Sequence, residues 1–200
     1  MRDLDNIGTV AALSPDYLGF IEYTRSPRFV GAGFRTPELA DSIRRVGVFV
    51  NESIDVIEGR ITSARYDAVQ LHGEEGPDFC ARLRDKGVPV IKVFRVDDEF
   101  DFDETKAYFN KVDQLLFDAR GKQPGGNGIR FDPHTLQRYD QRIPFFLSGG
   151  LQPETLLEDI ANLSGMNLYG VDLNSGVERA PAIKDPDRVR ASIQHVRSVK

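Results

Sequence analysis

The sequence contains one cysteine, Cys80, and no long hydrophobic run. A single thiol excludes an internal disulfide. No apolar stretch approaches the ~20 residues that span a bilayer, so no membrane partner is expected. Basic residues are also few, because 26 Lys and Arg stand against 31 Asp and Glu and give a net charge of −5. Nonspecific nucleic-acid binding needs clustered positive charge, so no nucleic-acid partner is expected either.

The amino-terminal segment, residues 1–13, is polar and acidic. Such a segment is neither a secretory signal nor a transit peptide, and we expect a cytoplasmic protein. The chain has 200 residues, of which 40% are hydrophobic. This length suits one domain with a substantial core and is too short for two ordinary ones. We therefore expect a single domain over residues 1–200.

Short β-branched or aromatic runs alternate with longer amphipathic stretches, which is typical of βαβ units around a parallel sheet. Seven strands are predicted, at Tyr17–Ile21, Arg45–Val50, Ala68–Leu71, Val88–Val93, Gln114–Asp118, Ile143–Leu147 and Leu168–Asp172. Eight helices are predicted, at Asp3–Leu13, Pro37–Ile43, Ser53–Tyr66, Pro77–Lys86, Glu99–Asn110, Pro133–Tyr139, Glu154–Leu163 and Pro186–Val199. Prolines in the first turn and an N-cap serine at Ser53 support several helix starts.

The pattern predicts an α/β protein with a (β/α)₈ TIM barrel. That barrel takes eight strands, each preceding its helix. Here a helix comes first, at Asp3, so we expect the chain as written to lack the first strand of the barrel. A doubly wound open sheet is the structural alternative. The barrel is favoured because the motifs described below follow strands spread around the whole sheet.

Two glycine-bearing turns follow the last two predicted strands, at Ser148-Gly149-Gly150 and Asn174-Ser175-Gly176. Bare backbone N–H groups at such turns can approach phosphate oxygens closely. The loops after the last two strands are the recurrent phosphate site of TIM barrels. We therefore expect a small, phosphorylated substrate there, although a glycine pair taken alone usually marks a turn.

Three further residues fall at the carboxyl ends of predicted strands or just beyond, where barrel sites form. Asp118 ends one strand and precedes a loop with four glycines, and partial burial there favours a proton donor over a helix cap. Those glycines are Gly121, Gly125, Gly126 and Gly128. His72 reaches the same rim, although a lone histidine is more often structural. Arg28 could clamp a substrate carboxylate, although surface arginines are common.

We expect no catalytic or metal-binding role for the single cysteine or for the other two histidines. Cys80 falls in a helical pattern beside Phe79 and Leu83, so a buried, inert thiol is expected. His134 and His195 fall on predicted outer helices. No spacing among histidines and carboxylates indicates a metal site.

Seven collinear segments resemble the phosphoribosylanthranilate isomerase family of tryptophan biosynthesis. They are Tyr17–Ile21, Ser26–Arg28, Val46–Asn51, Gln70–Gly73, Phe117–Asp118, Ser148–Leu151 and Val171–Glu178, with Lys184-Asp185 following at family spacing. The resemblance implies a (β/α)₈ barrel that converts N-(5-phosphoribosyl)anthranilate to 1-(2-carboxyphenylamino)-1-deoxyribulose 5-phosphate without a cofactor. This Amadori rearrangement needs an acid and a base.

The resemblance also implies roles for individual residues. Asp118 matches the aspartate that protonates the furanose ring oxygen, and Arg28 matches the arginine associated with the anthranilate carboxylate. His72 and Asp172 match residues that line the pocket. The phosphate loops match at Gly149, Gly150, Ser175 and Gly176.

Two features depart from the family pattern. The family base is a cysteine in a Lys-Val-Cys-Gly-Met type sequence, and Met1-Arg2-Asp3 begins where that motif finishes. Glu22 stands where relatives carry an apolar residue, and it either points outward or repels an anionic substrate.

Three hypotheses remain open at this stage. The native protein is the isomerase, and this version starts late at an internal methionine. Alternatively, the chain is a noncatalytic phosphate-ligand-binding or assembly protein derived from the isomerase. A third hypothesis keeps an enzyme but assigns it the substrate of a related phosphate-binding barrel of histidine or tryptophan synthesis, which explains Arg28 less well. Either a monomer or a homodimer is expected.

Overall fold

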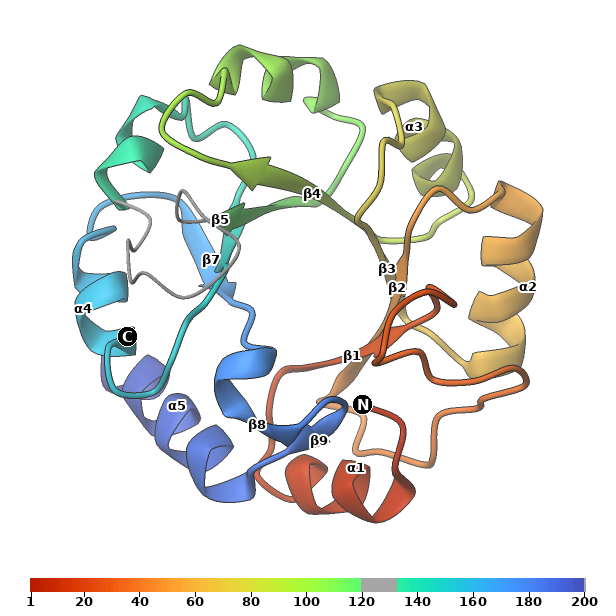
Figure 1. Ribbon diagram of the computed structural model, residues 1–200. Coiled ribbons are helices and arrows are strands. Elements are labelled where there is room, and N and C mark those ends of the chain that lie inside the picture. Colours follow the sequence, from red (N-terminus) through yellow and green to blue (C-terminus); the bar gives the residue numbers. More distant parts are fainter. Residues whose placement is uncertain (120–132, 200) are drawn as a thin grey trace.

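The computed structural model describes residues 1–119 and 133–199. A parallel sheet curls around a central axis and the helices cover its outside (Figure 1). Seven strands lie side by side in chain order, at β1 Tyr17–Ile21, β2 Arg44–Phe49, β3 Ala68–Leu71, β4 Val90–Val96, β5 Gln114–Ala119, β6 Phe145–Ser148 and β7 Leu168–Val171. The predicted fold class and the seven strands of the parallel sheet are confirmed, and the open-sheet alternative is wrong because the sheet is curled.

Five α-helices and three short 3₁₀-helices are formed by the described residues. The α-helices are α1 Leu4–Ala11, α2 Ile54–Ala64, α3 Pro77–Asp85, α4 Leu156–Ala161 and α5 Pro186–Ser198. The 3₁₀-helices are η1 Phe102–Tyr108, η2 Pro133–Arg138 and η3 Ser175–Val177. The expected cap of α2 is confirmed, since the Ser53 hydroxyl accepts from the Val56 N–H. None of these helices is long and apolar enough to cross a membrane.

The expected helix at Pro37–Ile43 is wrong. Thr36 is buried, and both its N–H and its hydroxyl donate to the carbonyl of Ala64, at 3.3 and 2.7 Å. This anchor holds the chain extended, and Arg44 then enters β2 by donating to the Asp16 carbonyl at 2.9 Å. Of the other seven predicted helices, five are the α-helices, and two, at Glu99–Asn110 and Pro133–Tyr139, are the 3₁₀-helices η1 and η2.

The core has two layers that follow from the period of two along each strand. One small cluster fills the barrel lumen, and it consists of Val46, Ala68, Ile91, Val93, Leu116 and Phe146, with Tyr17 against it. A larger cluster fills the space between sheet and helices. Because alternate residues face alternate sides, the lumen series continues to Gln70 and His72 after Ala68 and to Asp118 after Leu116. Polar residues therefore cap the apolar lumen at its carboxyl end.

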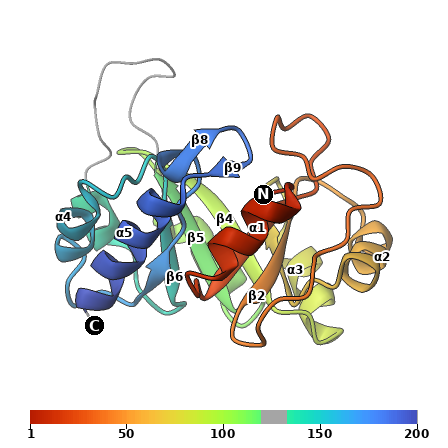
Figure 2. The same ribbon diagram turned by 90° about the horizontal axis from the view of Figure 1, so that it is seen from below.

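The two ends of the sheet, β1 and β7, approach one another near their amino ends. The hydroxyls of Tyr17 and Tyr169 lie 2.9 Å apart. Further along β1, the Met1 amino group donates to the Gly19 carbonyl at 3.2 Å. After β7 the chain forms η3 and a small hairpin, β8 Glu178–Ala180 and β9 Ile183–Lys184, which were not expected. The hairpin lies at the carboxyl end of the barrel (Figure 2).

Glycine positions in the fold give a stability prediction. Gly59 is exposed within α2, and a Cβ added there meets no atom within 4 Å. We expect Gly59→Ala to raise the free energy of unfolding by about 0.5–1 kcal/mol in urea denaturation, because alanine loses less backbone entropy in a helix. Gly47→Ala is the opposing control, since its Cβ would lie 2.5 Å from Tyr66. A loss of stability from Gly59→Ala would contradict the prediction.

Candidate active site

His72 and Asp118 face each other at the carboxyl end of the lumen. His72 follows β3 and is held by its N–H, which donates to the Phe49 carbonyl at 2.8 Å. Asp118 lies in β5 in register with Ser148 of β6. The His72 Nε2 atom is 3.5 Å from Asp118 Oδ2, which is an electrostatic contact rather than a close hydrogen bond. The structure thus brings the predicted acid and the predicted pocket histidine together.

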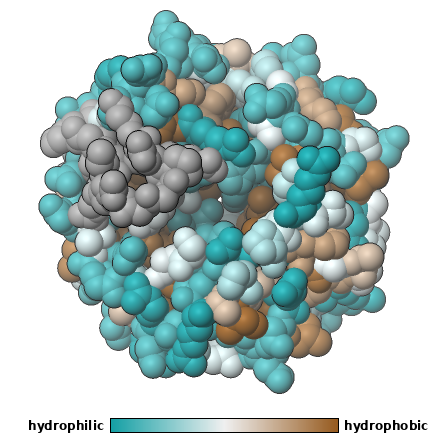
Figure 3. Space-filling model, viewed as in Figure 1, coloured by the Kyte–Doolittle hydropathy of each residue, from teal (hydrophilic) through white to brown (hydrophobic). Residues whose placement is uncertain are grey.

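Asp172 joins this pair from the end of β7. Its N–H donates to the Leu147 carbonyl at 2.8 Å. Desolvation raises the pKa of Asp172, and the nearby Asp118 raises it further, whereas Lys184, His72 and a hydrogen bond from Gln70 act in the opposite direction. Two carboxyl groups therefore lie together at the carboxyl end of the lumen, which we call the mouth. In such an arrangement at least one of the two is easily protonated. On this face hydrophilic residues surround a central hollow (Figure 3).

The two glycine-bearing turns lie against each other. A Cβ on Gly176 would lie 1.9 Å from the Leu151 carbonyl oxygen, so the loop after β7 touches the loop after β6. Gly149 has φ +103°, and a Cβ there would lie 2.0 Å from the Ala119 carbonyl oxygen. Gly150 also has a positive φ, of +67°. Only glycine fits the close approaches at Gly149 and Gly176, and the backbone of both turns is bare.

Arg28 is engaged by Glu178 of the hairpin. Its Nε lies 3.0 Å from both carboxylate oxygens, and its Nη2 lies 2.7 Å from Oε2. Lys184 Nζ donates to Glu178 Oε1 at 3.1 Å and to the Asn174 side-chain oxygen at 2.8 Å. Burial alone would raise the pKa of Glu178, but the hydrogen bonds from Arg28 and Lys184 outweigh it and hold that pKa below its ordinary value. Sequence reasoning missed this partnership, because Arg28 and Glu178 lie 150 residues apart.

Glu22 does not present an unpaired charge at the mouth. Arg60 Nη2 lies 2.7 Å from Glu22 Oε1, and the Tyr66 hydroxyl donates to the same oxygen. The Glu22 side chain is 7% exposed. Its charge is therefore compensated, and the repulsion considered from the sequence is not expected. Beside it, residues 22–25 and 49–52 line a cavity of about 350 Å³.

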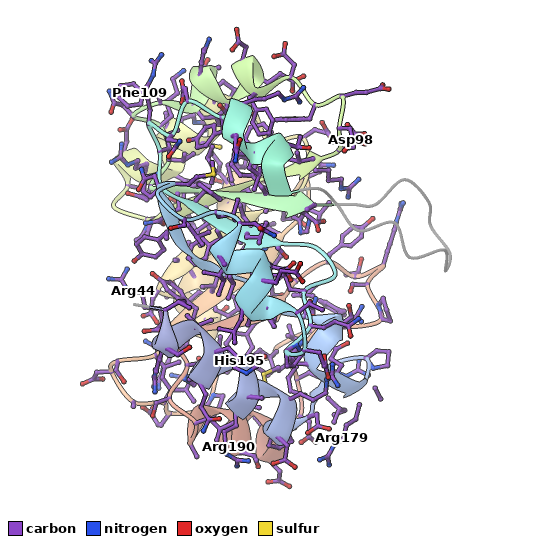
Figure 4. All side chains as sticks on the ribbon, turned by 90° about the vertical axis from the view of Figure 1, so that its left-hand side faces the viewer. Arg44, Asp98, Phe109, Arg179, Arg190 and His195 are labelled. Atoms are coloured by element: carbon purple, nitrogen blue, oxygen red, sulfur yellow. The ribbon has the colours of Figure 1, made fainter. Side chains whose placement is uncertain are left out.

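Cys80 and His195, two of the residues set aside from the sequence, lie on outer helices. Cys80 is fully buried, as expected, and burial raises the pKa of its thiol to about 12. His195 lies on the outer helix α5, where its Nδ1 is 2.9 Å from the Pro153 carbonyl (Figure 4). No group of three His, Cys, Asp or Glu side chains within 1–119 and 133–199 is arranged to hold a metal. Gly121, Gly125, Gly126 and Gly128 fall outside the described residues.

The Glu178 cluster gives a pH-dependent prediction. We expect Glu178→Gln to lower the free energy of unfolding at pH 7 by about 1–3 kcal/mol, because Arg28 and Lys184 lose their charged acceptor. A carboxyl whose pKa is lowered on folding stabilises above its unfolded pKa, and this contribution is lost as the pH falls. The difference from wild type should therefore shrink below about pH 4 in urea titrations.

Glu154→Gln is the matched control for this pH series. Glu154 pairs with Arg188 on the surface, where its side chain is 58% exposed, so only a small change is expected. If the two variants lost equal stability at pH 7, the assignment of a stabilising role to Glu178 would be wrong.

Comparisons with known proteins agree on one family. The pattern of the family described as N-(5'phosphoribosyl)anthranilate (PRA) isomerase matches residues 1–195. The N-(5'-phosphoribosyl)anthranilate isomerase of Parabacteroides distasonis is 40% identical over 98% of this chain and 90% of its own length. That of Phocaeicola vulgatus is 37% identical over 98% and 95%.

Solved structures agree with this result. The crystal structure of phosphoribosyl anthranilate isomerase from Thermotoga maritima has a TM-score of 0.82 and 29% identity, covering 99% of this chain and 96% of that one. A structure of phosphoribosyl anthranilate isomerase in complex with reduced 1-(o-carboxyphenylamino)-1-deoxyribulose 5-phosphate has a TM-score of 0.78 and 27% identity, covering 99% and 95%. With the family pattern spanning nearly the whole sequence, the chain belongs to the N-(5'-phosphoribosyl)anthranilate isomerase family.

Proposed function

We propose that this protein isomerises N-(5-phosphoribosyl)anthranilate to 1-(2-carboxyphenylamino)-1-deoxyribulose 5-phosphate in tryptophan biosynthesis, without a cofactor. The observation that carries the proposal is the pairing of His72 with Asp118 at the mouth of the lumen. A fixed guanidinium and two touching glycine turns lie at the same end of the barrel. Membership of the isomerase family supports the same reaction.

The two anionic ends of the substrate have separate binding groups in this proposal. The phosphate ester binds to the bare backbone of the two turns, at Gly149, Gly150, Ser175 and Gly176. Arg28 binds the anthranilate carboxylate. Because its Nε and Nη2 face Glu178, the edge that carries Nη1 points away from Glu178 and is presented to the ligand.

Asp118 supplies the acid in the proposed mechanism. Its carboxyl group donates a proton to the furanose ring oxygen, the C1–O bond breaks, and the amine lone pair forms a C1=N double bond. A base then removes the proton from C2, the C2–H electron pair forms the C1=C2 bond, and the π pair of the C1=N bond returns to nitrogen, which gives an enolamine. The C2 hydroxyl loses its proton and C1 gains one, which yields the ketone. His72 and Asp172 line the space in which these transfers occur.

The base is not assigned among the described residues. Cys80 is excluded, because it lies on α3 outside the barrel and its thiol pKa is raised to about 12. The family resemblance places the base on a cysteine of a Lys-Val-Cys-Gly sequence preceding the position of Met1. The Met1 amino group already donates to the Gly19 carbonyl of β1, as a neighbouring parallel strand does.

The proposal is tested by fluorescence-monitored conversion of freshly formed phosphoribosylanthranilate. Three proteins are compared: the 200-residue chain, the chain extended by a strand ending in Lys-Val-Cys-Gly before Met1, and the same extension with serine for cysteine. We expect conversion by the cysteine form and a loss of roughly 10²- to 10⁴-fold in the other two.

Two outcomes would contradict the proposal in different ways. If the cysteine form binds the reduced product analogue but converts nothing, the protein is the noncatalytic binding protein considered from the sequence. If no form binds the analogue or converts the substrate, the assigned substrate is wrong. Rescue of a tryptophan auxotroph by the cysteine form would exclude the noncatalytic alternative.

We further propose that residues 1–200 act as one cytoplasmic domain, as a monomer or a homodimer. A structure of mutually generated monomers of the dimeric phosphoribosylanthranilate isomerase from Thermotoga maritima has a TM-score of 0.77 and 26% identity to this chain. Analytical ultracentrifugation of the purified protein distinguishes the two states.

A further inference from the structure

We propose that a buried ion pair outside the lumen, Glu75–Lys92, positions His72 against Asp118. The pair lies between the sheet and its outer layer, and its side chains are 2% and 3% exposed. It therefore takes no direct part in the mechanism proposed above. What it contacts instead is the loop that carries His72.

Lys92 of β4 directs all its donors at this loop. Its Nζ lies 2.6 Å from the Gly73 carbonyl, 3.3 Å from the Leu71 carbonyl and 3.1 Å from Glu75 Oε2. An ammonium group has three protons, so each of these contacts uses one of them. The two carbonyls flank His72 in the chain, and the ammonium therefore fixes the backbone on both sides of the imidazole.

The Glu75 carboxylate accepts hydrogen bonds from the backbone of the same loop and of the loop after β2. Its Oε2 accepts from the Gly73 N–H at 2.9 Å, and its Oε1 accepts from the Asn51 N–H at 2.7 Å. Asn51 in turn accepts from the Glu74 N–H at 2.7 Å and has φ +52°, an uncommon value for a residue with a side chain. The loops that follow β2 and β3 are thus joined to Lys92 of β4 through one carboxylate.

The energetics favour a positioning role over simple stabilisation. Burying two charges costs several kcal/mol per ion, which the pair recovers only when every polar atom is satisfied. Apolar residues of similar size often stabilise a protein equally well. Here every hydrogen bond given for the two side chains ends within the pair, on the loop around His72 or on Asn51. The pair therefore determines where this loop lies and, with it, the 3.5 Å separation of His72 from Asp118.

A second ion pair, on neighbouring strands of the same sheet, provides a matched control. Arg45 and Asp67 join β2 to the start of β3 through two side-chain hydrogen bonds of 2.8 and 2.7 Å. This pair is more exposed, at 24% and 36%, and lies at the amino end of the strands. Asp67→Asn therefore removes a cross-strand ion pair at the end of the sheet opposite to His72 and Asp118.

The first test needs no turnover and therefore stands apart from the proposed function. The ¹³C–¹H signal of the His72 ring is assigned among three histidines, and its change on Asp118→Asn is measured at one pH. We expect a clear change in the wild-type and Asp67→Asn backgrounds. In Lys92→Met and Glu75→Gln the change should fall to less than half, because His72 no longer faces residue 118.

Folding of each variant is checked by circular dichroism and thermal denaturation. The double variant Glu75→Gln/Lys92→Met leaves no unpaired buried charge and serves if a single variant does not fold. The proposal would be overturned if Asp118→Asn changed the His72 ring signal as much in a folded Glu75 or Lys92 variant as it does in the wild type.

The second test rests on the proposed function and uses the extended, cysteine-containing protein. We expect Lys92→Met to lower kcat by about 10-fold or more with little change in KM, since a displacement near 1 Å at a catalytic site is costly. In the His72→Gln background the same substitution should have much less effect. Equal losses in both backgrounds would refute positioning through His72. A wild-type protein without activity would refute the proposed function instead and leave the first test intact.

Discussion

Replacing Asp118 with asparagine is expected to lower kcat by roughly 10²- to 10⁴-fold in the protein extended before Met1 by the strand ending in Lys-Val-Cys-Gly. Asparagine keeps the size of the side chain but has no proton to give to the ring oxygen. The side chain is 16% exposed at the mouth and close to His72 rather than packed in the core, so folding should change little. Steady-state kinetics and thermal denaturation of the same preparation measure both effects.

Asp85→Asn is the matched control for this substitution. Asp85 is exposed at the end of the outer helix α3, and its replacement should leave kcat unchanged. A near-normal kcat in Asp118→Asn would remove Asp118 from its role as the acid. An equal loss in Asp85→Asn would show that the assay reports folding rather than proton transfer.

The second large effect is expected at Gly176, where the two glycine turns touch. A Cβ there would lie 1.9 Å from the Leu151 carbonyl oxygen, so Gly176→Ala must push the loops after β6 and β7 apart. If the loops share one phosphate, one or two charge-assisted hydrogen bonds of about 1.5–3 kcal/mol are weakened. We expect KM to rise about 10- to 100-fold, and inhibition by inorganic phosphate to weaken in parallel.

Gly165→Ala separates backbone strain from loss of the phosphate site. Gly165 has φ +82° in the turn after α4, and an added Cβ meets no atom within 4 Å. Its replacement should reduce stability, because alanine is strained at that φ, but should leave KM unchanged. A wild-type KM in Gly176→Ala would show that the two turns do not hold a common phosphate.

The sequence was most informative where local rules decide the structure. The strands from Tyr17 to Val171 were recognised because buried parallel strands are β-branched or aromatic and end at glycine and polar residues. Asp118 and His72 were placed at the mouth because residues at the carboxyl ends of such strands meet at one rim. The Ser53 cap followed from its hydroxyl preceding an amphipathic run.

What the sequence could not reveal depends on contacts between distant residues. The segment Pro37–Ile43 has a plausible helical start, but Thr36 is held extended by the carbonyl of Ala64, 28 residues away. The compensation of Glu22 depends on Arg60, which lies on α2. No local pattern signals that Glu178 holds Arg28, because the two residues are 150 positions apart and meet only in the folded barrel.

The central claim is that Asp118 faces the ring oxygen of a sugar phosphate anchored by the turns after β6 and β7. It is tested most directly by a crystal structure of the cysteine-containing protein with the reduced product analogue. We expect a phosphate bound by backbone N–H groups of both turns, and a carboxyl oxygen of Asp118 about 2.6–3.2 Å from the oxygen derived from the furanose ring. A phosphate bound elsewhere, or an Asp118 side chain turned away from that oxygen, would contradict it.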